Sequence, residues 1–159
     1  MSDVLRALVV DDDEALRALT AEVLSHEGWE VVQESVGSVV PRRVKEEPYH
    51  LLLVDQRLPD ADGIELVETV RTSGYTGPAI VITGYPTVED AINALGCAAT
   101  DYLCKPVAAA DLVRISRRAR ARAHSAQDWE YLWSTLSKRY GFRNVMSCDE
   151  ATRQCYITA

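Results

Sequence analysis

Short apolar runs alternate with amphipathic stretches along the first two-thirds of the chain. The apolar runs predict strands at 5–10, 30–33, 51–54, 79–83 and 101–104. Between them, apolar residues recur at helical spacing, which predicts helices at 14–27, 39–46, 63–72 and 88–95, and a long helix from about Asp111. Gly28 ends the first of these helices. Pro41 weakens the prediction of the second, because proline is tolerated best in a first turn.

The fold class follows from the apolar runs themselves. The run at 51–54 is apolar at every position, which is typical of a parallel strand buried on both faces. Strands that alternate with helices, joined by right-handed crossovers, predict an α/β fold with a doubly wound parallel sheet of five strands. In such sheets the functional site lies at the carboxyl ends of the strands.

Polar residues follow four of the five predicted strands at that edge. Asp11 and Asp12 come after the first strand, Asp55 after the third, Thr83 ends the fourth, and Lys105 follows the fifth. Three neighbouring carboxylates repel one another, and a hard cation such as Mg²⁺ together with one ammonium group would offset that charge. A single aspartate at a strand end is usually a turn residue or a helix cap. Five matching residues at five expected places favour a functional site.

These residues resemble the bacterial response regulator receiver domains, the CheY-like family. The resemblance covers about 4–120 and is carried by Leu8-Val9-Val10-Asp11-Asp12, Leu53-Val54-Asp55, Leu58-Pro59-Asp60, Val81-Ile82-Thr83-Gly84 and Asp101-Tyr102-Leu103-Cys104-Lys105-Pro106. It implies a flavodoxin-like sheet with strand order 2-1-3-4-5, followed here by an extended C-terminal helix. It also implies a cis peptide bond before Pro106.

The resemblance implies a role for each residue at the strand ends. Asp55 would be the phosphoacceptor of a two-component system, receiving its phosphoryl group from a sensor histidine kinase. Asp11, Asp12 and Asp55, with the backbone carbonyl of Arg57, would hold Mg²⁺.

The remaining roles concern the phosphoryl group itself. Thr83 would hydrogen-bond a phosphoryl oxygen, and Lys105 would pair with its charge. Thr83 and Tyr102 would be the switch residues, with the aromatic ring of Tyr102 changing orientation. These roles describe a signalling switch, not an enzyme.

Composition and charge narrow the function further. The chain has 159 residues and a formal net charge of −7, which suits one acidic domain with a tail. That charge disfavours direct nucleic-acid binding. We interpret the arginine cluster at 114–122 as a solvated helix face, paired with acidic residues of a partner subunit. No apolar run reaches membrane-spanning length and no signal peptide is evident, so we expect a cytoplasmic protein. The four cysteines form no Cys-x-x-Cys pair and are expected to be free thiols.

The last third of the chain predicts a helix that is long for so small a sheet. Apolar residues follow a heptad pattern at Leu112, Ile115, Ala119, Ala126, Trp129, Trp133, Leu136 and Tyr140. The pattern favours a coiled-coil homodimer through 112–140 over an ordinary amphipathic helix that packs on its own domain.

Three segments follow from these patterns: a receiver domain at 1–120, a helical linker at 121–141 and a tail at 142–159. The tail resembles the start of the ATPase domain in sigma-54-dependent activators of the NtrC type. The chain has neither a Gly-rich phosphate-binding loop nor an evident helix-turn-helix. We therefore expect a regulator of transcription whose output domain is absent from this chain, either because the chain is truncated or because the regulator lacks one.

Three other functions are compatible with parts of the pattern. A haloacid-dehalogenase-type phosphatase needs a second acid two residues after its nucleophile, where this chain has Arg57. An FMN-binding module needs a Ser/Thr/Gly-rich loop after the first strand, where the aspartates at 11–13 would repel a phosphate. The strongest alternative is a degenerate receiver that acts as a binding module without phosphorylation.

Overall fold

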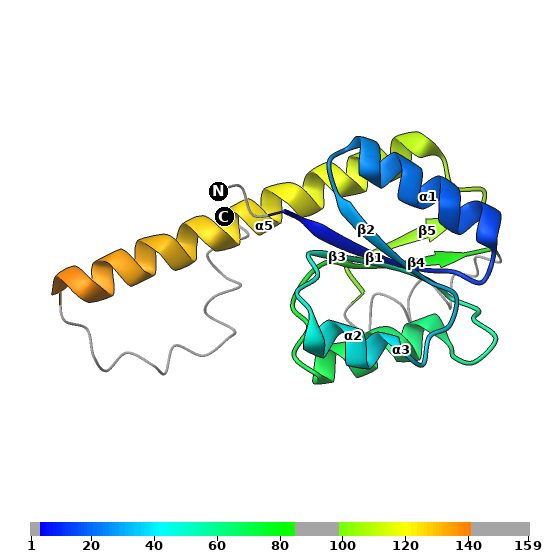
Figure 1. The fold of residues 1–159 in the computed structure, drawn as a ribbon, viewed down its shortest axis with the longest axis horizontal. Helices are drawn as coiled ribbons and strands as arrows, with labels where there is room; N and C mark the ends of the chain where they lie inside the picture. The colour runs from blue at the N-terminus through cyan, green and yellow to red at the C-terminus, as the bar shows by residue number, and fades with distance from the viewer. Residues whose placement is uncertain (1–3, 85–98, 141–159) are drawn as a thin grey trace. The chain divides into compact units, whose positions relative to one another are not determined.

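The computed structural model describes residues 4–84 and 99–140, with 126–140 described by backbone alone. The helix expected at 88–95 and the tail at 142–159 lie outside the described residues. The elements in chain order are β1 (Arg6–Val10), α1 (Glu14–His26), β2 (Glu30–Glu34), α2 (Val40–Glu46), β3 (Leu51–Asp55), α3 (Gly63–Thr72), β4 (Ala79–Thr83), β5 (Asp101–Cys104) and α5 (Ala109–Tyr140) (Figure 1).

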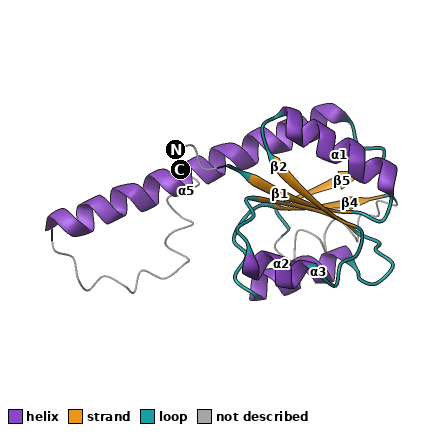
Figure 2. Ribbon diagram, viewed as in Figure 1, coloured by secondary structure: helices purple, strands orange, loops and turns teal. Residues whose placement is uncertain are grey.

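The sheet has the expected architecture. Its five strands are all parallel and lie in the order β2-β1-β3-β4-β5, as the receiver resemblance implies. β1 lies between β2 and β3, so that Leu8 pairs with Val32 on one side and Leu52 on the other. Helices cover both faces, with α1 and the first part of α5 on one face and α2 and α3 on the other (Figure 2).

The core forms because every residue of β3 and β4 is buried. Alternate strand residues, including Leu8, Leu52 and Val54, pack in one cluster with Val67 and Val70 of α3. Their neighbours along each strand face the other helical layer, because successive side chains of a strand point to opposite faces. Burying one such aliphatic side chain stabilises the fold by about 1.5–3 kcal/mol, so β3 and β4 hold their carboxyl ends firmly in place.

Local interactions fix where the helices begin. The carboxylate of Asp13 caps α1 by accepting hydrogen bonds from the N–H groups of Ala15 and Leu16. Asp62 caps α3 in the same way. Pro41 lies in the first turn of α2, where its missing N–H costs no helical hydrogen bond, and this removes the doubt about that helix. The last helix begins at Ala109, slightly earlier than expected.

The arginine cluster is engaged within its own domain. Arg114 and Arg118 lie 3.8 and 3.3 Å from the Asp101 carboxylate, and Arg117 lies 3.3 Å from Glu27. Arg120 donates a hydrogen bond to the backbone carbonyl of Glu27. Exposed pairs of this kind contribute little to stability. These acidic partners belong to the loop after α1 and to β5, and pairing of the cluster with a partner subunit stays a prediction.

No helix within the described parts of the chain is both long enough and apolar enough to cross a membrane. Among the cysteines, the structure describes Cys104 as an exposed free thiol, as expected.

The first prediction concerns Gly63, where α3 begins against the end of β3. A Cβ at this position would lie 2.3 Å from the backbone carbonyl oxygen of Asp55. We expect Gly63→Ala to lower the free energy of unfolding by about 1–3 kcal/mol, the usual cost of overpacking, measured by urea denaturation. Gly84→Ala is the matched control, because among the described residues its Cβ would meet nothing closer than 3.9 Å. Equal stability of the two variants would contradict this account of the close approach.

Candidate functional site

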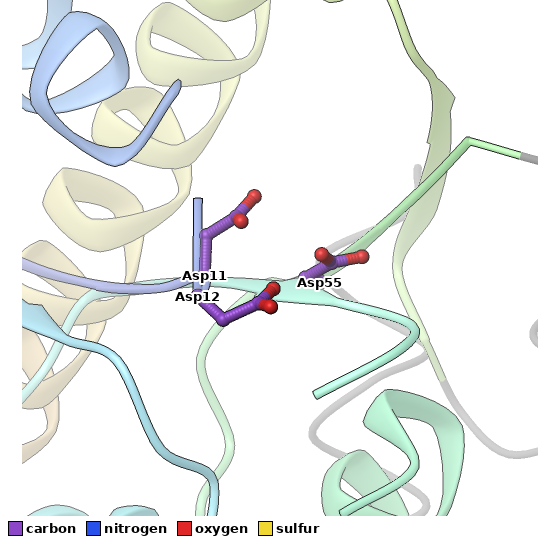
Figure 3. A group of neighbouring side chains, drawn as sticks. All are labelled: Asp11, Asp12 and Asp55. Atoms are coloured by element: carbon purple, nitrogen blue, oxygen red, sulfur yellow. The ribbon is translucent and has the colours of Figure 1, made fainter. Parts of the chain in front are cut away.

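Three carboxylates converge at one edge of the sheet (Figure 3). Asp11 and Asp12 follow β1, and Asp55 ends β3, the strand beside it. Each of the three offers an oxygen within 4.8 Å of the others. Asp11 and Asp55 are 2% and 6% exposed, whereas Asp12 is exposed to solvent. The structure therefore brings together the three acids that the sequence predicted as metal ligands.

Lys105 supplies the positive charge of this site. Its Nζ lies 2.9 Å from Oδ2 of Asp55 and 3.2 Å from Oδ2 of Asp11. Lys105 follows β5, and its backbone N–H donates a 2.7 Å hydrogen bond to the carbonyl of Thr83 at the end of β4. The peptide bond between Lys105 and Pro106 is cis, as the resemblance implied.

Burial and charge shift the pKa values at this site in a consistent way. Burial raises the pKa of Asp11, and the negative charge of Asp55 adds to the rise. The hydrogen bond from the Asp13 N–H and the charge of Lys105 oppose it. For Lys105, burial alone would lower the pKa, but the hydrogen bond to Asp55 and the charges of both aspartates outweigh burial and raise it. Lys105 therefore stays protonated at neutral pH.

The two oxygens of Asp11 differ in their partners. Oδ1 accepts a 2.8 Å hydrogen bond from the N–H of Asp13. Oδ2 is buried, has no hydrogen-bond partner, and is held by its ion pair with Lys105 alone among the described side chains. A buried anionic oxygen without a hydrogen bond is costly. Because it faces two more carboxylates, the arrangement fits a hard cation that takes oxygen ligands.

Two other expected residues lie at the same edge. Thr83 is 2% exposed and ends β4, between β3 and β5. The backbone N–H of Arg57 donates a 3.3 Å hydrogen bond to Oδ1 of Asp55. The contact of Thr83 with a phosphoryl group, and that of the Arg57 carbonyl with a metal ion, stay predictions.

The loop after β3 is held in place by Asp60. Its carboxylate accepts 2.8 Å hydrogen bonds from the N–H groups of Gly37 and Ser38, which lower the pKa of Asp60. These bonds join the loop before α2 to the loop that follows Asp55.

Sequence reasoning missed two residues that support the site. Nη1 of Arg17, in α1, donates a 2.6 Å hydrogen bond to the backbone carbonyl of Asp11. Oε1 of Gln56 accepts a 3.3 Å hydrogen bond from the phenol of Tyr102, and Gln56 is only 6% exposed. A glutamine directly after a buried strand was the available signal for the second. Nothing in the helical pattern marks Arg17.

Comparison with known proteins gives concordant results. Residues 7–117 match the response regulator receiver domain family. Regulatory protein AtoC of Escherichia coli (strain K12) is 27% identical over 147 residues, which cover 92% of this chain and 32% of that protein. This chain thus spans about a third of the length of AtoC.

Solved structures show the same likeness. A CheY-like response regulator receiver domain protein from Methanospirillum hungatei JF-1 is 31% identical, with a TM-score of 0.71, covering 77% of this chain and 99% of that one. The beryllofluoride-activated NtrC4 receiver domain dimer is 26% identical, with a TM-score of 0.68, covering 72% and 94%.

The second prediction concerns Asp11 in the absence of divalent cations. Burial raises the pKa of Asp11 in the folded state above its unfolded value of 3.8, so the protonated side chain stabilises the fold relative to the ionised one. This stabilisation is fully present below pH 3.8 and is lost as the pH rises through the folded-state pKa. Asp11→Asn keeps an acceptor for Asp13 but removes the charge. At pH 7 in EDTA we expect this substitution to raise the free energy of unfolding by on the order of 1 kcal/mol relative to the native protein.

The measurement is urea denaturation at a series of pH values from 7 down toward about 4. The stability gained by Asp11→Asn over the native protein should shrink as the pH falls. Glu68→Gln, which neutralises an exposed carboxylate on α3, is the control and should change little. A destabilised Asp11→Asn protein at pH 7 would contradict the repulsion described here.

Proposed function

The chain belongs to the response regulator receiver domain family, and on that premise we propose that it is a phosphorylation-controlled switch of a two-component system. Asp55 is the phosphoacceptor, and the donor is a sensor histidine kinase. The observation that carries the proposal is the contact of Lys105 with Asp55 and Asp11 beside a third carboxylate.

The acidic cluster supports a role for Mg²⁺ in this reaction. Asp11, Asp12 and Asp55, with the backbone carbonyl of Arg57, would hold the ion. When bound, Mg²⁺ neutralises negative charge on the transferring phosphoryl group. The buried Oδ2 of Asp11, which has an ion pair with Lys105 but no hydrogen-bond partner among the described residues, is the feature that most favours a cation there.

The chemistry is a phosphoryl transfer between two side chains. A carboxylate oxygen of Asp55 forms a bond to phosphorus as the bond from phosphorus to the kinase imidazole nitrogen breaks. That nitrogen keeps the electron pair, and the product is an acyl phosphate on Asp55. Lys105 offsets charge on the phosphoryl oxygens, and Thr83 donates a hydrogen bond to one of them. No further substrate is turned over, so the chain acts as a switch and not as an enzyme.

The new group changes the charge at the strand ends. The phosphorylated side chain carries about −1.5 to −2 charges in place of the single negative charge of the Asp55 carboxylate, and it brings several acceptor oxygens beside Lys105 and Thr83. That change is large enough to bias a two-state element, and we assign this element to Thr83 and the ring of Tyr102. The altered surface then acts on the long helix α5.

The output of the switch passes through the helical linker at 121–141. We propose that 112–140 pairs with a second copy as a coiled-coil homodimer, and that the complete regulator controls transcription from the cytoplasm. The alignment with AtoC reaches beyond the receiver match, which supports a regulator of the NtrC type that acts through an output domain not contained in this chain.

Particular residues disfavour each of the alternative functions. A degenerate binding module would not need the ion pairs between Lys105 and two buried aspartates. A phosphatase of the haloacid-dehalogenase type would need an acid at Arg57. An FMN module would bring a phosphate against Asp11 and Asp12, which repel it.

The third prediction tests phosphorylation directly. Incubation with acetyl phosphate and Mg²⁺ should add the mass of one phosphoryl group to the intact protein. Asp55→Asn should gain none, and EDTA should abolish the gain in the native protein. If beryllofluoride with Mg²⁺ also fails to bind, the degenerate binding module becomes the better description.

The fourth prediction tests the dimer by light scattering after size-exclusion chromatography. Leu136→Glu places a charge in the heptad seam and should shift the mass from dimer toward monomer. Ser134→Glu adds the same charge outside the seam and should leave the dimer intact. A native protein that is monomeric both with and without beryllofluoride would overturn the coiled-coil proposal.

A further inference from the structure

Two side-chain links join the end of β3 to β5, although β4 lies between these strands. The first is the ion pair of Asp55 with Lys105. The second is the hydrogen bond from the phenol of Tyr102 to Oε1 of Gln56, at 3.3 Å. Gln56 directly follows the phosphoacceptor, and Tyr102 lies on β5, the strand that Lys105 directly follows. The proposed phosphoryl transfer uses the first link and makes no use of Gln56.

The backbone of Gln56 is held from two sides. Its N–H donates a 2.7 Å hydrogen bond to the carbonyl of Ile82 in β4. Its carbonyl accepts a 2.7 Å hydrogen bond from the N–H of Gly63, at the start of α3. Gly63 approaches so closely that a Cβ there would lie 2.9 Å from the Cα of Gln56. The backbone of Gln56 is therefore fixed in position, and the residue is buried, with 6% of its surface exposed.

Burial makes the partner of this amide oxygen important. A buried acceptor that loses its donor costs free energy, because water cannot replace the lost bond. Tyr102 is half-buried and packs against the cluster formed by β1, β3, β4, α2 and α3. Its ring is apolar and its hydroxyl is polar, so an inward ring is favoured when the hydroxyl meets an acceptor. Gln56 provides that acceptor.

We propose that Gln56 is a positioning residue for Tyr102. By accepting the phenolic hydrogen bond, it favours the inward orientation of the ring and ties that orientation to the segment that carries Asp55. This role deepens the proposed switch and rests on it for its signalling consequence. The contact itself is independent of phosphorylation.

Thermodynamic linkage makes the role measurable. Suppose that a ligand at Asp55 changes the equilibrium between the two orientations of Tyr102 by some factor. Forming the hydrogen bond between Tyr102 and Gln56 must then change the affinity of Asp55 for that ligand by the same factor. Gln56→Met keeps a long, unbranched side chain and removes the amide. In the native background it should change the affinity for beryllofluoride with Mg²⁺ by about 2- to 10-fold, the range that one net hydrogen bond supplies.

The test uses the full chain labelled with 3-fluorotyrosine, with Tyr102→Phe to assign its fluorine resonance. Gln56→Met should shift the Tyr102 resonance in the ligand-free protein. Gln33→Met is the matched control, because Gln33 is exposed on β2, and it should leave that resonance unchanged. In the Tyr102→Phe background, Gln56→Met should alter beryllofluoride affinity by less than about 2-fold, as expected for uncoupled sites.

Two results would overturn the proposal. One is a Tyr102 resonance that Gln56→Met does not move, and the other is an equal effect of Gln56→Met on affinity in both backgrounds. Gln56→Leu serves as the second variant if circular dichroism shows that Gln56→Met fails to fold. Failure of the native protein to bind beryllofluoride would count against the proposed switch, whereas the ligand-free fluorine spectrum would still decide the role of Gln56.

Discussion

Mutual repulsion among Asp11, Asp12 and Asp55 is the constraint on which the rest of this site depends. The parallel sheet brings the ends of β1 and β3 together, so two of these carboxylates are buried beside each other. Burial raises the pKa of Asp11, and Lys105 offsets part of the negative charge. The same excess of buried negative charge makes the cluster suitable for a hard cation and, once a cation is bound, for a phosphoryl group.

Carboxylates that repel one another stay together only if the surrounding backbone holds them in place. β3 and β4 are buried along their whole length, and the close approach of Gly63 to Asp55 leaves no room for a side chain between α3 and the end of β3. Asp60 joins the same loop to the start of α2. The free energy that keeps the acids together thus comes from apolar burial in the three inner strands, β1, β3 and β4, and not from any contact among the acids themselves.

The links across β4 suggest how a rigid support transmits a signal. Tyr102 lies on β5 and Lys105 directly follows that strand, and they contact Gln56 and Asp55, which are consecutive in the chain. A charge added at Asp55 therefore acts on β5 through an ion pair and a neutral hydrogen bond at once. α5 follows β5 closely, and Arg114 and Arg118 of that helix pair with Asp101 at the start of the strand. β5, Lys105 and α5 follow one another closely in the chain, so the proposed switch and the proposed output helix are directly connected.

Sequence alone determined the strands, the described helices to within a few residues, the parallel sheet and the acids at its carboxyl edge. It could do so because hydrophobic period and strand ends are local properties. The tertiary structure decided that Lys105 bridges Asp55 and Asp11, that Arg17 supports Asp11 and that Gln56 meets Tyr102. It also decided that Arg114, Arg117 and Arg118 of α5 pair within their own domain. Most of these contacts join residues far apart in the chain, so they depend on strand register, burial and side-chain reach, which no local pattern encodes.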